Sequence, residues 1–190
     1  MKSEDIVPKA FPKLDGVLVN LREVSINDAQ DITHLMSYNV SKYLWEVPNP
    51  YSVGDALDFI KSAHIDFNSF KALHFAIEYK TKSKPRNNVV LVGAISLKNM
   101  DLVNKKASLG YWIGEQYWGR GIATECVSMI IDYAFSAELG LKELSAYIFP
   151  GNKASIRVLE KNGMNKVGEV NEYHKIYGVW VRSIVMNITA

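Results

Sequence analysis

The stretch Gln116-Tyr117-Trp118-Gly119-Arg120-Gly121-Ile122-Ala123 places two glycines and an arginine between a predicted strand and a predicted amphipathic helix. The residues before it, 107–113, are rich in aromatic and branched side chains, which favour a strand. After it, apolar residues recur every three or four positions from Ile122 to about Ser136, the pattern of a helix with one buried face. This stretch therefore predicts a strand, a tight loop and the first turn of a helix.

The loop is a predicted anion-binding site. Its glycines carry no Cβ, so a ligand can approach the backbone closely. The free N–H groups of a helix's first turn point toward such a ligand, and the helix dipole favours negative charge there. Arg120 adds a full positive charge with forked donors. The glycine spacing matches neither the nucleotide P-loop nor the three-glycine dinucleotide motif, and a plain tight turn is the alternative interpretation.

Length and composition indicate a single globular domain at 16–190 with an N-terminal extension at 1–15. The 190 residues are 48% hydrophobic and 22% charged, which are ordinary values for a globular domain. A net charge of +2 argues against a strongly basic nucleic-acid-binding surface. No segment approaches the roughly 18 apolar residues of a membrane span, and 1–15 lacks the apolar stretch of a signal peptide. We expect neither nucleic-acid binding nor membrane association, and either a monomer or a homodimer.

The single cysteine, Cys126, cannot form an internal disulfide, which fits a reducing, cytoplasmic compartment. It falls on the apolar face of the helix predicted after Ile122, so we expect it to pack in the core rather than to act as a reactive thiol. Neither the histidines nor the carboxylates show a metal-ligand spacing, and no metal is expected.

The rest of the chain reads as alternating strands and helices. Strands are predicted at 17–21, 73–79, 89–97, 107–113, 143–149, 167–170 and 179–188. Helices are predicted from Ser25 to about Met36, after Ser52, from Ile122 to about Ser136 with Gly140 as its C-cap, and between Asn152 and Gly163 as N-cap and C-cap. Two prolines and several aromatic residues predict an irregular segment at 43–51, and 80–88 is a predicted hairpin loop.

Two segments resemble the GNAT acetyltransferase superfamily. Gln116-x-x-Gly119-x-Gly121 is similar to the acetyl-CoA loop of that family, written Gln/Arg-x-x-Gly-x-Gly/Ala. The second segment, 152–164, is similar to the family pattern Asn-x-x-Ala/Ser followed by Glu-Lys-x-Gly-Phe, with Met164 in place of the phenylalanine. The continuation Ala123-Thr124-Glu125 looks like the branch that acetylates the N-termini of ribosomal proteins.

The resemblance implies an α/β (α+β) GNAT fold: a twisted, mixed, mostly antiparallel sheet of about seven strands with about four helices. Strand 107–113 would splay away from strand 143–149, and acetyl-CoA would bind in the gap, with backbone groups near Trp112 and Ile113 as partners. The first two helices and segment 43–51 would form one wall of the acceptor groove. The cofactor-binding residues that the resemblance implies are Trp112, Ile113, Gln116, Trp118, Gly119, Arg120, Gly121, Ile122, Ala123, Asn152 and Ser155.

The resemblance also implies the residues that act on the thioester. The backbone N–H near Ile113 would bind the developing oxyanion. Many members protonate the departing thiolate with a tyrosine seven residues after the asparagine, where this chain has Leu159. The resemblance to the ribosomal-protein branch, which uses a serine at this position as the hydrogen-bond partner of the thiolate, implies Ser155 as general acid or thiolate stabiliser, and a role in helix capping is its alternative.

The general base is open, because Ser108 stands where relatives often carry a glutamate. A water-mediated relay, Glu46 or His174 could take its place. The predicted function is acetyl-CoA-dependent N-acetyl transfer by direct attack of a neutral amine, with a protein or peptide α-amine as the acceptor. A small-molecule amine such as a polyamine or a drug, or a non-catalytic acyl-CoA-binding module, are the alternatives.

Overall fold

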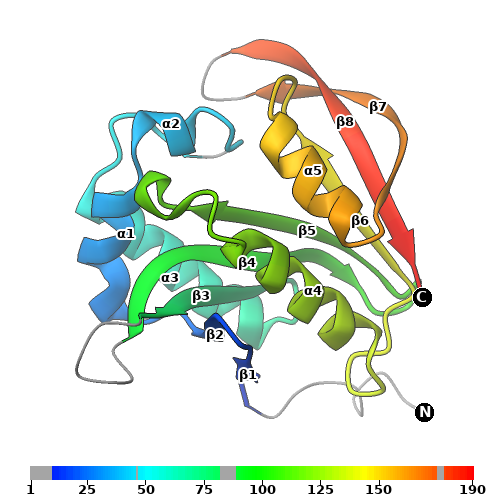
Figure 1. The fold of residues 1–190 in the computed structure, drawn as a ribbon, viewed down its shortest axis with the longest axis horizontal. Coiled ribbons are helices and arrows are strands. Elements are labelled where there is room, and N and C mark those ends of the chain that lie inside the picture. Colours follow the sequence, from blue (N-terminus) through cyan, green and yellow to red (C-terminus); the bar gives the residue numbers. More distant parts are fainter. Residues whose placement is uncertain (1–9, 46, 82–88, 175–177) are drawn as a thin grey trace.

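The computed structural model describes residues 10–45, 47–81, 89–174 and 178–190, which form one open sheet with helices on both faces (Figure 1). The strands are β1 (Leu14–Asp15), β2 (Val19–Glu23), β3 (Leu73–Lys80), β4 (Val89–Asp101), β5 (Lys106–Ile113), β6 (Glu143–Ile148), β7 (Asn165–His174) and β8 (Val179–Thr189). The helices are α1 (Ala29–Leu35), α2 (Tyr38–Ser41), α3 (Val53–Asn68), α4 (Ile122–Phe135) and α5 (Lys153–Lys161), with 3₁₀ turns η2 (Ile26–Asp28) and η3 (Glu115–Tyr117).

The eight strands follow the order β1-β2-β3-β4-β5-β6-β8-β7. Every neighbouring pair is antiparallel except β5 and β6, which run parallel. A parallel pair needs a crossover, and α4 supplies it between the two strands. The predicted mixed, mostly antiparallel sheet is thus confirmed.

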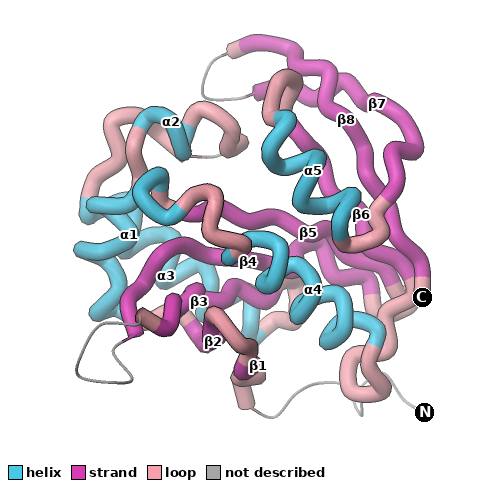
Figure 2. Tube along the Cα trace, in the orientation of Figure 1, coloured by secondary structure: helices cyan, strands magenta, loops and turns pink. Residues whose placement is uncertain are grey.

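A hydrophobic core lies on each face of the sheet. In Figures 1 and 2, α4 and α5 lie in front of the sheet and α3 lies behind it. In front, α4 buries Cys126 and Ile130 completely, as its apolar spacing predicts. Burial also raises the pKa of the Cys126 thiol, which confirms a packing role for this side chain. Behind the sheet, Ile32 of α1 and Ile60 of α3 belong to a second buried cluster.

The structure differs from the predicted elements in three places. β1 and α2 are additional, and they have only two and four residues, too few for a periodic pattern to show. β1 lies within the segment 1–15 and pairs with β2. The helix predicted from Ser25 begins as the 3₁₀ turn η2 and continues as α1.

Gly140 was predicted to cap α4, and this prediction is wrong. The helix ends at Phe135, and its C-cap is Ser136, whose backbone is extended. The Ser136 hydroxyl donates a 2.7 Å hydrogen bond to the carbonyl of Tyr133, so a serine satisfies a carbonyl of the last turn and no glycine is needed there. Gly140, with φ 63°, sits in the turn that follows. In α5 the C-cap is Asn162, and Gly163 with φ 80° is the next residue.

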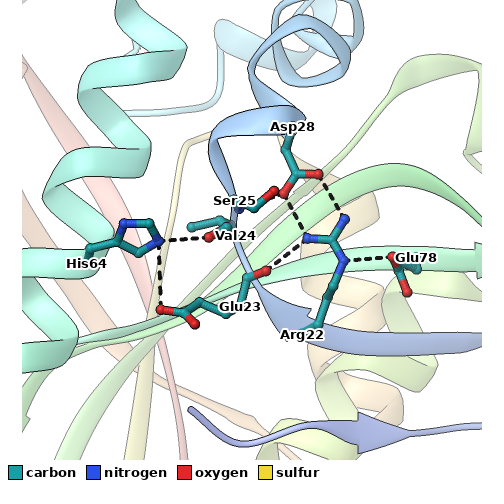
Figure 3. Close-up of polar contacts among 7 residues, drawn as sticks. All are labelled: Arg22, Glu23, Val24, Ser25, Asp28, His64 and Glu78. Atoms are coloured by element: carbon teal, nitrogen blue, oxygen red, sulfur yellow. Dashed lines mark hydrogen bonds and ion pairs between the residues drawn. The ribbon is translucent and has the colours of Figure 1, made fainter. Parts of the chain in front are cut away.

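A polar cluster fixes α1 against the sheet (Figure 3). Arg22 of β2 donates to both carboxylate oxygens of Asp28 at 2.8 Å and, through Nε, to Glu78 of β3 at 2.6 Å. Asp28 also accepts the Ser25 N–H at 2.7 Å. Burial opposes ionisation of Asp28, but the hydrogen bonds from Arg22 and Ser25 outweigh it, so the pKa of this carboxyl is lowered. The cluster therefore sets where α1 begins.

Strands β5 and β6 separate partway along their length. Their parallel pairing joins only Lys106–Ser108 to Glu143–Ser145. Beyond these residues β5 stays paired with β4 as far as Ile113, and β6 stays paired with β8 as far as Ile148. Each strand thus follows its outer neighbour and a gap opens between them, which confirms the predicted splay.

Candidate active site

The gap between β5 and β6 belongs to a cavity of about 1280 Å³, whose lining residues we divide into two groups, the loop arm and the α3 arm. The loop arm is lined by 109–113, 117–124, 146–149 and 151–155. The α3 arm is lined by residues of α3, the segment after α2, and the facing ends of β3 and β4, among them Tyr43, Trp45, Tyr51, Phe59, Asp66, His74 and Ser96. Pockets for one small molecule usually span about 300 to 1,000 Å³, so this cavity has room for two substrates.

The glycine loop forms the outer end of the loop arm. Gly119 and Gly121 have φ of 74° and 81°, a region that glycine adopts without strain. Gly121 is the N-cap of α4, so the free N–H groups of the first turn of α4 lie at this end of the arm. A Cβ on Gly119 would meet no atom within 4 Å, so the space over this glycine is open. The loop therefore has the geometry of a phosphate site.

Side chains of the loop hold its own backbone. The Trp118 indole N–H donates to the carbonyl of Ile113 at 2.7 Å, which joins the loop to the end of β5. Arg120 donates to the carbonyl of Gln116 at 2.9 Å, and its guanidinium lies 5.3 Å from the centroid of the Tyr117 ring. Arg120 is exposed, so its remaining donors are available to an anion at the loop.

Alternate backbone groups of β5 face the gap. The Gly114 N–H donates to Val92 of β4 at 2.8 Å. Backbone groups alternate in direction along a strand, so those of Gly110 and Trp112 also point toward β4. The groups of Tyr111 and Ile113 point the opposite way. The Trp118 indole meets the Ile113 carbonyl on that side, which fits this assignment. The N–H of Ile113 therefore faces the loop arm.

Ser155 lies on the first turn of α5 and contacts Tyr111 across the loop arm. Its backbone N–H donates to the side chain of Asn152 at 3.2 Å, so Asn152 is the N-cap that the sequence predicts. Its hydroxyl oxygen lies 3.0 Å from the hydroxyl oxygen of Tyr111. Burial raises the pKa of Tyr111 to about 12, although the bond with Ser155 lowers it, so this phenol is protonated at neutral pH.

Most of the predicted site residues lie along the loop arm. The lining includes Trp112, Ile113, Trp118, Gly119, Arg120, Gly121, Ile122, Ala123, Asn152 and Ser155. Gln116 contributes its carbonyl to Arg120 instead. Glu46 lies outside the described residues. Tyr111 is not among the predicted site residues. A tyrosine hydroxyl in the strand before the glycine loop is the feature of the sequence that could have indicated it.

His174 lies behind the wall of the cavity. It is fully buried, with its Nε2 3.3 Å from the carbonyl oxygen of Leu44. Its ring packs against those of Trp45 and Phe149, with centroids 5.2 and 5.3 Å away. His174 thus packs against two aromatic residues that line the cavity, and its role as a base stays a prediction.

A chain of three polar side chains, which the sequence does not indicate, lines the α3 arm. His74 Nδ1 lies 2.8 Å from the hydroxyl oxygen of Ser96, and its Nε2 lies 3.3 Å from the carboxylate of Asp66. Burial and the charge of Lys98 lower the pKa of His74, and Asp66 offsets this only in part. The imidazole is therefore neutral at pH 7.

Within residues 10–45, 47–81, 89–174 and 178–190, no helix has both the length and the apolar character needed to cross a bilayer. The same residues contain no group of three or more histidine, cysteine, aspartate or glutamate side chains arranged to hold a metal ion.

A sequence model of the acetyltransferase (GNAT) domain matches residues 19–165, which include the glycine loop, both separating strands and α5. The chain belongs to the GNAT acetyltransferase family. The match ends just after the second of the two segments that carry the resemblance in the sequence. It spans most of both arms of the cavity, and this GNAT protein is accordingly an N-acetyltransferase.

The names of two relatives of this GNAT enzyme refer to different kinds of acceptor. It is 30% identical over 161 residues to a Bacillus subtilis protein named "Putative ribosomal N-acetyltransferase YdaF", a match that covers 81% of each chain. It is 25% identical over 170 residues to the spermidine N(1)-acetyltransferase of Escherichia coli strain K12, covering 90% of this chain and 85% of the relative.

Solved structures share the fold of this acetyltransferase. The microcin C7 self-immunity acetyltransferase MccE, crystallised in complex with acetyl-CoA and AMP, superposes with a TM-score of 0.79 at 23% identity. The superposition covers 92% of this chain and 94% of MccE.

Proposed function

We propose that this acetyltransferase moves the acetyl group of acetyl-CoA onto the α-amine of a protein or peptide in the cytoplasm. The observation that carries the proposal is the α3 arm, which is broad and walled by aromatic side chains such as Tyr43, Trp45 and Phe59. Such walls suit the backbone and first side chains of a peptide. The compartment is supported by the single, buried, unpaired thiol of Cys126.

The loop arm fits acetyl-CoA. The N–H groups from Trp118 to Ala123 would hold the pyrophosphate, with Arg120 adding charge. Trp112 directs its backbone groups toward β4, so the groups of Tyr111 and Ile113 are the ones that would bind the pantetheine amides, because the β5 edge beyond Ser108 has no strand partner on the β6 side. Acetyl-CoA supplies a thioester carbonyl, and the N–H of Ile113 faces the arm in which that carbonyl would develop negative charge.

Ser155 is the proposed partner of the departing thiolate, and Tyr111 is the residue that orients it. Because the Tyr111 phenol is protonated at neutral pH, it can donate its proton to the Ser155 hydroxyl oxygen. With the bond in this direction, the Ser155 hydroxyl proton is free to form a hydrogen bond in the loop arm. A serine held in this way can donate a hydrogen bond to sulfur as the carbon–sulfur bond breaks.

The choice of an α-amine follows from the cost of deprotonation. An α-amine has a pKa of about 7.7 to 8.0 and a lysine side chain of about 10.4, so the neutral form of lysine costs about 3.5 kcal/mol more. Ser108 cannot act as the strong base that a glutamate would provide in relatives. An acceptor that is already partly neutral at pH 7 therefore fits this site better than lysine.

A polyamine is the second candidate acceptor. Three carboxylates of α3, those of Asp55, Asp58 and Asp66, line the cavity, and the similarity to a spermidine acetyltransferase points the same way. Two of the three are already engaged, because Asp55 accepts the Ser52 N–H at 2.8 Å as a helix cap and Asp66 contacts His74. Fewer carboxylates are thus available than a polycation would need.

Incubation with acetyl-CoA, a set of peptides that differ in their first residue and each contain one internal lysine, and spermidine tests the proposal. Mass spectrometry should place the acetyl group on the first residue of the peptides. Acetylation mainly on lysine or on spermidine would show that the acceptor is wrong, while still showing an active acetyltransferase.

A further inference from the structure

His74, Ser96 and Gly110 form a row across the sheet. The register pairs His74 of β3 with Ser96 of β4, and Ser96 with Gly110 of β5. Side chains of directly paired residues lie on the same face of a sheet, and all three positions line the cavity, His74 and Ser96 in the α3 arm and Gly110 at the adjoining edge of the loop arm. The row ends at the gap, because the pairing of β5 with β6 stops at Ser108.

The space above Gly110 connects Ser96 to the gap. A Cβ on Gly110 would meet no atom within 4 Å, and the backbone of this residue has no positive φ that would call for glycine. Neighbouring strands lie about 4.8 Å apart, so roughly one water molecule spans the distance from the Ser96 hydroxyl to a group in the gap. Gly110 thus keeps open a path that any larger residue would narrow.

The three side chains have a defined hydrogen-bond direction. A neutral imidazole has one N–H donor and one acceptor nitrogen. The carboxylate of Asp66 can only accept, so Nε2 carries the proton and Nδ1 accepts the hydroxyl proton of Ser96. Ser96 and His74 are buried, whereas 33% of the Asp66 side chain is exposed. The hydrogen-bonded chain therefore runs from the buried hydroxyl of Ser96 to the partly exposed carboxylate of Asp66, which also lines the cavity.

We infer that Ser96, His74 and Asp66 conduct to solvent the proton that the acceptor ammonium loses, through a water molecule held above Gly110. The inference rests on the proposed function only in requiring an amine acceptor. In this route the water molecule separates Ser96 from the amine, so the three residues act through water and are positioning residues. This route requires no glutamate at position 108.

The proton balance is complete. The ammonium gives one proton through water to Ser96, whose own proton passes to His74 Nδ1, while the Nε2 proton moves to Asp66 and solvent. The neutral amine then attacks the thioester, the carbon–nitrogen bond forms and the carbon–sulfur bond breaks. Ser155 gives its proton to the departing thiolate, and the second amine proton, lost as the amide forms, restores the Ser155 hydroxyl. One proton is released for each acetyl group transferred.

The charged groups that face His74 set its working range. Asp66 faces it from α3 and Lys98 from β4, and the Phe59 ring of α3 lies edge-on at 5.5 Å. Because the pKa of His74 is lowered, the imidazole can accept a proton at pH 7 and loses that ability only in acid. A base of this strength suits an α-amine better than a lysine, whose pKa is much higher.

Three substitutions interrupt the chain, and each has a matched control. His74→Gln, Asp66→Asn and Gly110→Ala break the relay at its middle, its solvent end and its water site. His64→Gln changes a half-exposed histidine that instead contacts the carbonyl of Val24 at 2.9 Å (Figure 3). Asp132→Asn changes an exposed carboxylate of α4 that does not line the cavity, and Gly168→Ala fills a similarly open glycine site on β7.

The test is the pH dependence of kcat/KM with a peptide α-amine and with trifluoroethylamine, which is largely neutral at pH 7. With the peptide at pH 7, the relay variants should lose up to about tenfold, because roughly a tenth of the α-amine is already neutral there, and the loss should shrink as the pH approaches 9. With trifluoroethylamine they should match the parent enzyme. The control variants and the affinity for acetyl-CoA should not change.

Equal losses with both amines, or losses that do not depend on pH, would overturn the relay. NMR of the imidazole nitrogens gives a second reading that needs no activity: the Nε2–H tautomer of His74 is expected, and the Nδ1–H tautomer would reverse the chain and refute it. If the parent enzyme acetylates spermidine but no peptide, the proposed acceptor fails, and the same comparison with spermidine still decides the relay.

Discussion

The two arms of the cavity present different parts of the chain to their substrates. The loop arm presents mainly backbone: the N–H groups at the start of α4 and the unpaired edge of β5 beyond Ser108. The α3 arm presents side chains, namely its aromatic wall and the Asp66–His74–Ser96 chain. Substitutions in the loop should therefore change the affinity for acetyl-CoA, whereas substitutions along the α3 arm should change turnover and its pH dependence.

The largest effect is expected from Gly121→Val. The valine would place a branched side chain on the path to the α4 N–H groups and strain a backbone with φ of 81°, so binding of acetyl-CoA should be lost. Gly140→Val is the matched control, because Gly140 also has a positive φ of 63° but does not line the cavity. Calorimetry should show no binding for the first variant and parental affinity for the second. Normal affinity in a folded Gly121→Val protein would refute the assignment of the loop.

The second effect concerns Ser155→Ala, which should lower kcat by about tenfold or more. Alanine keeps the backbone N–H that Asn152 caps, so the start of α5 is preserved. Circular dichroism and the Kd for acetyl-CoA should therefore match the parent protein. A lower melting temperature with kcat per folded molecule unchanged would instead assign Ser155 to helix stability.

A smaller effect is expected from Tyr111→Phe. Losing the hydroxyl frees Ser155 to rotate but leaves it in place, so kcat should fall by only about threefold to tenfold, roughly the worth of one hydrogen bond. KM for acetyl-CoA should be unchanged. Combining this change with Ser155→Ala should add little to the loss from Ser155→Ala alone, because the two act as a unit. Fully additive losses would show that Tyr111 acts independently.

The smallest effect concerns stability in acid. Because the pKa of His74 is lower in the folded protein than in the unfolded chain, the unfolded state binds more protons near and below pH 6.5. The free energy of unfolding should decrease as the pH falls through that range, and this share should be absent in His74→Gln. Urea unfolding at pH 5.5 and 7.5 measures it. An identical pH dependence in both proteins would mean that His74 titrates normally.

The two arms also differ in how much of them could be predicted from sequence. Much of the loop arm comes from two continuous segments, 116–125 and 152–164, so their resemblance to the GNAT family could identify it. The α3 arm joins Asp66, His74 and Ser96 from three elements, and only the register of β3 and β4 brings the last two together. No local pattern contains that register. The C-cap of α4 was also predicted wrongly, as Gly140 instead of Ser136. The Ser136 hydroxyl donates a hydrogen bond to a carbonyl of the last helical turn, so the helix ends without a glycine.

The choice of amine is the central claim, and one pair of peptides tests it most directly. Both peptides contain the same internal lysine, and one has a free α-amine whereas the other is blocked at its N-terminus. The initial rate of CoA release at pH 7 should be about 300-fold higher with the free peptide, as the difference of about 2.5 pKa units implies. Equal rates with the two peptides would contradict the account, because they would show that the enzyme deprotonates lysine as readily as an α-amine.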